Sequence, residues 1–98
     1  MFEVLLARGA LGDLRRIRAH DRARILDEIE RCLVEQPQRP SRNRRELTAL
    51  VPRWEHVPPV WELRVDEHRV FYDVDTQARV VIVRAVRRKG RSTTKEVV

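Results

Sequence analysis

One stretch decides the fold of this chain: Trp61-Glu-Leu-Arg-Val-Asp-Glu-His-Arg-Val-Phe-Tyr-Asp-Val-Asp75, followed closely by Arg79-Val-Val-Ile-Val-Arg-Ala-Val86. Apolar residues alternate along both segments, which is the pattern of strands that bury one face. The segments are therefore predicted to form a three-stranded antiparallel meander. Its buried face is predicted to hold Trp61, Leu63, Val65, Val70, Tyr72, Val74, Val81, Val83 and Ala85.

Arginines occupy the other face of the predicted meander. With turns at Asp66-Glu67 and Thr76-Gln77, Arg64 lies opposite Arg69, and Arg69 lies opposite Arg84. This register is an assumption, because neither turn carries the Asn-Gly pair that specifies a tight hairpin. Like charges directly opposite one another destabilise a sheet, so three in a row indicate a face that binds a polyanion. The alternative is that the long side chains extend into solvent at little cost.

Composition narrows the class of protein. The chain has 98 residues, which predicts a single domain over 1–98 with a thin core. Its net charge of +6 and pI near 10.9 favour nucleic acid, the ribosome or an acidic protein as partner. The first residues do not resemble a secretory signal, and no stretch reaches membrane-spanning length, so a cytoplasmic location is expected.

Cysteine and histidine give no reason to expect a metal or another cofactor. Cys32 is the single cysteine, which excludes an intrachain disulfide, and its helical spacing from Ile25 and Ile29 predicts a small core residue. The three histidines lack the i, i+4 spacing of a helical metal site.

The remaining segments predict an α+β arrangement. Phe2 to Ala7 suits a first strand, and Ala10 to Arg18 has helical spacing. A second helix is predicted from a cap at Asp21 to about Gln36, where Pro37 ends it, with Ile25, Leu26, Ile29, Cys32 and Leu33 on its buried face. The two helices are predicted to form a hairpin on the apolar face of a twisted, mainly antiparallel sheet.

The irregular link and the tail are both basic. Segment 46–51 suits either a short helical turn or a short strand, and Trp54 could stack on a base or pack its loop against the sheet edge. Because the helices are expected on the apolar side, the arginine face is predicted to stay open. Two basic segments, 38–45 and 87–95, are predicted to edge it.

These features in this order resemble the RelE/ParE-type toxins of bacterial type II toxin–antitoxin systems. The likeness is carried by Phe2-Glu-Val-Leu-Leu, Ala10-Leu-Gly-Asp-Leu-Arg-Arg, the central Trp61–Val74 segment and the basic exit Ala85-Val-Arg-Arg-Lys-Gly-Arg91. It covers essentially the whole chain and implies that family's fold.

The resemblance implies an activity and a partner. RelE-like members cleave messenger RNA in the ribosomal A site without metal, through attack of the 2′-hydroxyl on the adjacent phosphate. Positive donors must then surround the phosphate, while a base and an acid transfer protons. The matching positions imply a catalytic set of Arg69, Arg64, Lys89, Arg91 and Glu62, with Arg69 holding the phosphate. The implied RNA contacts are Arg84, Arg87, Arg88, Arg44, Arg45 and Lys95.

The chain departs from the family pattern near its end. Many relatives carry a Tyr or a His-Tyr pair there, whereas this sequence reads Thr93-Thr94-Lys95. Glu62 shares the arginine face and could act as the general base, or it could form a salt bridge that offsets Arg64. The general acid is left unassigned.

Three functions therefore stay open. The first is a ribosome-dependent endoribonuclease that blocks translation. The second is a ParE-like inhibitor of DNA gyrase, which acts as a binding module. The third is an inactive relative that only binds its antitoxin. Under each of them we expect an antitoxin with an acidic, partly disordered segment that folds on the basic surface.

Overall fold

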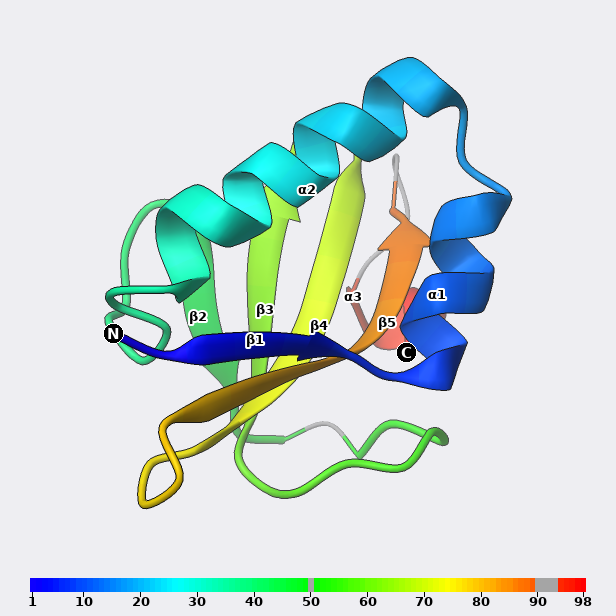
Figure 1. Cartoon of the computed structure of the whole chain (residues 1–98). Helices are drawn as coiled ribbons and strands as arrows, with labels where there is room; N and C mark the ends of the chain where they lie inside the picture. The colour runs from blue at the N-terminus through cyan, green and yellow to red at the C-terminus, as the bar shows by residue number, and fades with distance from the viewer. Residues whose placement is uncertain (50, 90–93) are drawn as a thin grey trace.

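The computed structural model describes the chain of 98 residues except residues 50 and 90–93 and the side chains of residues 95 and 96. The elements follow the order β1 (Glu3–Leu6), α1 (Arg8–Arg15), α2 (Ala19–Leu33), β2 (Arg44–Leu47), β3 (Val60–Val65), β4 (His68–Asp75), β5 (Val80–Arg88) and α3 (Thr94–Val97). Figure 1 shows α2 running across the sheet, with α1 beside β5.

The strands form one sheet in the order β1-β5-β4-β3-β2. Strand β1 pairs with β5 in parallel, and every other pair is antiparallel. The predicted α+β class with a mainly antiparallel sheet is confirmed. Segment 46–51, which suited either a helix or a strand, supplies the end of β2, the edge strand.

The main core lies between the helices and one face of the sheet. It combines Ile25, Ile29, Cys32 and Leu33 of α2 with the alternating apolar residues of the meander. Trp61 packs on Tyr72 with ring centroids 6.3 Å apart, as predicted. The hydroxyl of Tyr72 donates to the carbonyl of Pro37 at 2.5 Å, which ties the segment after α2 to the sheet.

The helix boundaries differ from those predicted. Helix α2 begins at Ala19 rather than after Asp21, and Arg18 at its N-cap makes no side-chain capping bond. It ends at Leu33, before Gln36, and Leu26 lies on its exposed side. Helix α1 begins at Arg8 and ends at Arg15. Helical spacing gives the buried stripe, but it does not specify the terminal residues of a helix.

The predicted register is correct for β3 and β4 and wrong for β4 and β5. The turn at Asp66-Glu67 is confirmed, with Asp66 at φ 54°, and Arg64 lies opposite Arg69. The second turn takes four residues, 76–79, instead of two. A bulge then shifts the pairing: Phe71 faces Ala85 but Tyr72 faces Val83, which leaves Arg84 as the extra residue. Arg69 therefore lies opposite Arg87, and the predicted Arg69–Arg84 pair was wrong.

The bulge also changes which residues are buried on which face. Ala85 was predicted beside Val81 and Val83, but it lies in a second, smaller core on the opposite face, and Val86 packs in the main core instead. The second core joins Leu47, Val60, Phe71 and Ala85 to Trp54, Val97 and Val98. The prediction that the arginine face stays open was therefore wrong for the part that the loop after β2 and the C-terminal residues cover.

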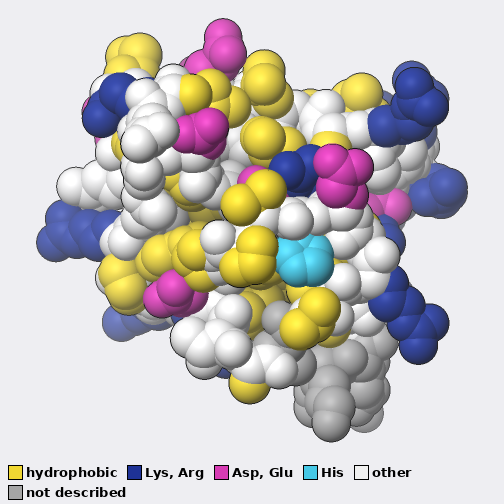
Figure 2. Space-filling view, turned by 90° about the horizontal axis from the view of Figure 1, so that it is seen from below, with side chains coloured by type: hydrophobic (Ala, Val, Ile, Leu, Met, Phe, Trp, Pro, Cys, Tyr) yellow, Lys and Arg dark blue, Asp and Glu magenta, His cyan; other side chains and the backbone are white. Residues whose placement is uncertain are grey.

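The loop between β2 and β3 also forms an apolar surface. Figure 2, which views the molecule from below, shows hydrophobic side chains gathered in the middle of the face and most of the Lys and Arg side chains toward its rim. Val51 and Val57 of this loop are 82% and 55% exposed. Among the described residues, no helix is both long enough and apolar enough to cross a membrane.

Candidate functional site

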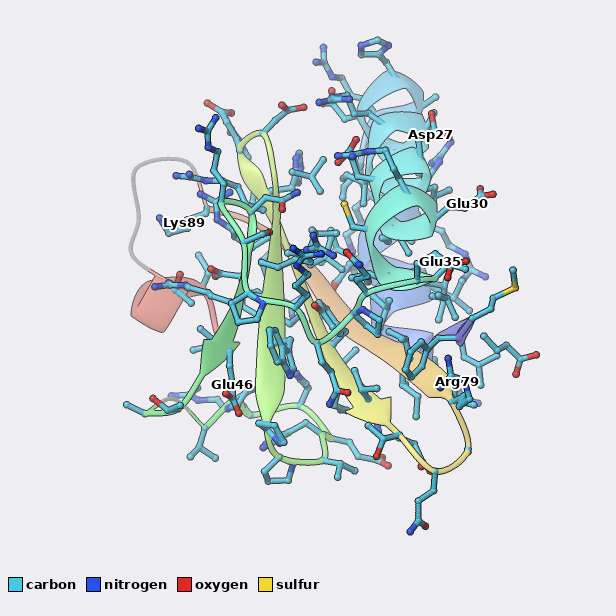
Figure 3. The ribbon with its side chains drawn as sticks, turned by 90° about the vertical axis from the view of Figure 1, so that its left-hand side faces the viewer. Asp27, Glu30, Glu35, Glu46, Arg79 and Lys89 are labelled. Carbon is cyan, nitrogen blue, oxygen red and sulfur yellow. The ribbon has the colours of Figure 1, made fainter. Side chains whose placement is uncertain are left out.

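A basic pocket of about 280 Å³ opens beside strands β2, β3 and β4. We call it the arginine pocket. Six of its residues are basic and one is acidic; the lining consists of Ser41, Arg42, Asn43, Arg44, Arg45, Glu62, Arg64, Arg69, Lys89 and Thr94. Figure 3 shows Lys89 on the opposite side of the sheet from Asp27 and Glu30 of α2. The molecule thus separates its basic pocket from the acidic side chains of that helix.

Arg64 and Arg69 bring two positive charges together on adjacent strands. Arg64 is exposed, and its backbone N–H donates to the carbonyl of Asn43 at 2.7 Å, which places it at the pocket wall. Arg69 is only 5% exposed. Its NH1 group donates to the carbonyls of Asp66 at 2.9 Å and His68 at 2.8 Å. Arg69 is thus fixed by the β3–β4 turn, whereas the side chain of Arg64 is exposed at the pocket wall.

The electrostatic environment of Arg69 favours an added negative charge. Burial lowers the pKa of Arg69, and the neighbouring Arg64 lowers it further. Arginine nevertheless stays protonated in proteins. An anion between the two guanidinium groups would remove their repulsion, so this pair is suited to a phosphate.

Glu62 is a buried carboxylate in the same pocket and is 5% exposed. The sequence offered a salt bridge with Arg64 as one interpretation, but the actual partner is Arg45, whose Nε donates to Oε1 at 2.9 Å. The other oxygen, Oε2, accepts from the hydroxyl of Thr94 at 2.7 Å. Glu62 is thus held by β2 on one side and α3 on the other.

Arg44 and Arg45, predicted together as RNA contacts, have different surroundings. The NH1 group of Arg44 donates to the carbonyls of Cys32 at 3.0 Å and Gln36 at 2.7 Å, so it caps the end of α2. Arg45 keeps 60% of its side chain exposed while it binds Glu62. Arg45 is therefore the one that can also reach a ligand.

The three basic residues at the end of β5, Arg87, Arg88 and Lys89, have different surroundings. The Lys89 backbone N–H donates to the Glu67 carbonyl at 2.7 Å, and the residue lines the arginine pocket. The exposed side chain of Arg88 pairs with Glu67 at 2.9 Å instead. Arg87 faces Arg69 across the strands, but its guanidinium forms an ion pair with Asp13 of α1.

Arg84 lies away from the pocket. Its guanidinium pairs with Asp73 at 2.8 and 3.3 Å, and the two side chains are 13% and 3% exposed. The predicted RNA contact at Arg84 therefore has no geometric support, since the bulge turns it into this buried pair. Arg91 lies outside the described residues, and Lys95 is described only by its backbone in α3.

Trp54 packs its loop against the sheet, as one of its two interpretations had it. Its ring lies 5.2 Å from that of Phe71, and the guanidinium of Arg87 is 5.3 Å from its centroid. Three polar residues of the pocket, Ser41, Asn43 and Thr94, were not named as site residues. They lie in the segments 38–45 and 87–95, which were predicted to edge the arginine face, but nothing in the sequence singled out these three.

Comparison with known proteins gives a family and a fold. The model of the family described as the ParE toxin of the type II toxin–antitoxin system parDE matches residues 4–92. A search of the curated proteins finds no match.

The similar solved structures are toxins and toxin–antitoxin complexes. The isolated RelE toxin of E. coli has 18% identity and a TM-score of 0.70, with 98% of this chain and 93% of that chain covered. The archaeal RelE–RelB complex from Pyrococcus horikoshii OT3 has 18% identity and a TM-score of 0.64, with coverage of 93% and 98%. The RelB–RelE complex from Methanococcus jannaschii has 20% identity and a TM-score of 0.61, with coverage of 86% and 88%.

Proposed function

This chain belongs to the family of RelE/ParE-type toxins of type II toxin–antitoxin systems, and we propose that it is a metal-independent endoribonuclease that cleaves messenger RNA on the ribosome. One observation carries the proposal: Arg64 and Arg69 face each other in a pocket that also contains the buried carboxylate of Glu62. Cleavage of RNA through its own 2′-hydroxyl needs such a combination of positive donors and a proton acceptor.

The roles follow from exposure and contacts. Arg69 is held by the β3–β4 turn, so it provides a fixed donor for the scissile phosphate, and the exposed Arg64 closes on the same phosphate from β3. Lys89 adds positive charge from the end of β5. Such donors stabilise the charge that builds on the phosphate oxygens in the transition state.

Glu62 is the general base of this proposal. Its carboxylate takes the proton of the 2′-hydroxyl, and the 2′-oxygen forms a bond to phosphorus. The bond from phosphorus to the 5′-oxygen breaks, and that oxygen takes a proton from solvent water. The products are a cyclic phosphate and a free 5′-hydroxyl end. Arg45 keeps the carboxylate in place while it is unprotonated.

The test is primer extension on messenger RNA in a cell-free translation reaction with purified protein. We expect cuts that need ribosomes and are lost in Arg64→Ala but kept in Arg15→Ala, a control at an exposed position of α1. A ribosome-free reaction shows whether the RNA is cut alone. Intact messenger RNA with normal translation would refute the proposal.

A second candidate is a ParE-like inhibitor of DNA gyrase. The apolar loop surface with Val51 and Val57 favours it, because a large exposed apolar patch marks a protein interface. No aromatic residue lines the described part of the arginine pocket, so base stacking there has no support. Loss of supercoiling activity by purified gyrase, together with intact messenger RNA, would select this function. Neither effect would leave a relative that only binds its antitoxin.

We further propose that the arginine pocket binds an acidic, partly disordered segment of a cognate antitoxin. The net charge of +6 and the basic lining of the pocket support this partner. Binding that neutralises the pocket would also exclude RNA from it. Competition between antitoxin peptide and RNA for the protein, measured at several salt concentrations, tests this.

A further inference from the structure

The C-terminal helix contributes a side chain to the wall of the arginine pocket. Thr94 is the first residue of α3 and is 5% exposed. Val97 and Val98 pack against the second core beside Leu47, Val60, Phe71 and Ala85. Because these apolar contacts dock α3 on the sheet, the position of Thr94 relative to β3 is fixed.

The hydroxyl of Thr94 closes a ring of hydrogen bonds. It donates to Oε2 of Glu62 at 2.7 Å and accepts from NH2 of Arg45 at 2.9 Å. Nε of Arg45 donates to Oε1 of Glu62 at 2.9 Å. The ring thus joins β2, β3 and α3, and each of its members contacts both of the others.

The hydroxyl at position 94 completes this ring in two ways at once. It must give one hydrogen bond and accept another, which serine and threonine can do and valine cannot. Without it, Oε2 of Glu62 would lose a donor in a buried place, and the exposed Arg45 would be the remaining restraint on the carboxylate. The bond from Thr94 goes to a charged carboxylate and is therefore one of the stronger kind, so its loss would leave the orientation of the carboxylate to Arg45 alone.

We propose that Thr94 is a positioning residue for catalysis, because its hydroxyl holds the Glu62 carboxylate in the orientation in which it accepts the 2′-hydroxyl proton. This inference rests on the proposed endoribonuclease function. Thr94 does not touch the RNA in this scheme; it acts through Glu62 and Arg45. Helix α3 therefore contributes to catalysis in this proposal, because it carries Thr94.

The test compares Thr94→Val with Thr94→Ser in the ribosome-dependent cleavage reaction. Valine keeps the shape of threonine and removes the hydroxyl, whereas serine keeps the hydroxyl. We expect Thr94→Val to lower kcat by about 10²-fold with KM little changed, because a misplaced catalytic group has an effect of that size. Thr94→Ser should stay close to wild type. Thr48→Val, on an exposed threonine just after β2, is the matched control.

A double-mutant cycle separates positioning from a structural role. In a Glu62→Gln background, Thr94→Val should lower cleavage no further, because the two changes remove the same function. Thermal melting of each variant gives its stability. If Thr94→Val does not fold, the same cycle is run with Thr94→Ala below its melting temperature, again beside Thr94→Ser.

Three results would overturn the inference: a folded Thr94→Val enzyme with normal kcat, a serine variant as impaired as the valine variant, or losses that multiply with those of Glu62→Gln. Failure of the proposed function gives a different result, since wild-type protein would then make no ribosome-dependent cuts at all. The two failures are thus distinguishable in the same experiment.

Discussion

Arg64 and Arg69 occupy directly opposite positions on β3 and β4, yet one is exposed and the other is almost entirely buried. Burial and the charge of Arg64 both lower the pKa of Arg69. Two carbonyls at the β3–β4 turn accept hydrogen bonds from Arg69, which offsets the cost of burying its charge beside Arg64. The pair therefore offers an anion two donors: Arg69, which the turn holds in place, and the exposed Arg64.

Alanine substitution should separate these two roles. The buried hydrogen bonds of Arg69 predict that Arg69→Ala lowers the free energy of unfolding by about 1–3 kcal/mol. Arg64→Ala, at an exposed position, should change it by no more than about 0.5 kcal/mol. Urea unfolding checks both values, and equal destabilisation by the two variants would contradict this assignment.

RNA binding should depend on salt, and Arg64 should account for part of that dependence. A phosphate contact with single-stranded RNA adds about 0.7 to the slope of log K against log salt concentration. Arg64→Ala should lower the slope by about that amount, measured by fluorescence anisotropy with a short RNA. Arg88→Ala, whose arginine pairs with Glu67 outside the pocket, is the matched control and should leave the slope unchanged.

The Asp73–Arg84 pair should be a determinant of stability and have no part in RNA binding. Asp73→Ala would leave the largely buried Arg84 with only the exposed carboxylate of Glu55, at 3.9 Å, and breaking a buried pair costs about 3–5 kcal/mol. Asp73 also accepts from the N–H of Val57 at 3.1 Å, so the loop over the second core should loosen. The double variant Asp73→Ala/Arg84→Ala should be more stable than Asp73→Ala alone in chemical unfolding. If the double variant were the less stable of the two, the unpaired charge of Arg84 would not be the cause of the destabilisation.

Tyr72 should make stability fall at alkaline pH. Burial raises the pKa of its hydroxyl above the ordinary value of 10.0. The folded protein then keeps a proton that the unfolded chain releases, so the stabilisation is complete below about pH 10 and is lost as pH rises further.

Tyr72→Phe tests this effect against its loss of a hydrogen bond. At about pH 7 the variant should be less stable by about 1–3 kcal/mol, because the Pro37 carbonyl loses its donor. Above about pH 10 its stability should fall less steeply than that of wild type. Parallel pH profiles of unfolding for the two proteins would contradict the prediction.

Much of the fold could be predicted from local patterns. Alternation placed Leu63, Val65, Val70 and Tyr72 on one face of the sheet. Helical spacing placed Cys32 on the buried side of α2. The Arg64–Arg69 pair also followed from the position of one turn. Phe71 was missed as a core residue, because it lies on the face that alternation assigns to polar side chains.

The candidate site was predicted less completely. Four predicted catalytic residues, Arg64, Arg69, Glu62 and Lys89, do line the pocket. Arg45 was also predicted, as an RNA contact, but its bond to Glu62 was not, and neither Asn43 nor Thr94 was named, because these contacts join segments that are far apart along the chain. Sequence alone also could not separate Arg84, in a buried ion pair, from arginines that line the pocket.

The sequence by itself determined the two long helices, the strands of the meander and, up to the bulge, the side of the sheet that each alternating residue faces, because these depend on a backbone period of two or 3.6 residues. Only the tertiary structure decided where the bulge lies, that a second core covers part of the arginine face, and which carboxylate each arginine binds. The reason is physical: the pleat is a property of neighbouring residues, whereas an ion pair forms between whichever charged groups the packed elements bring within a few ångströms of each other.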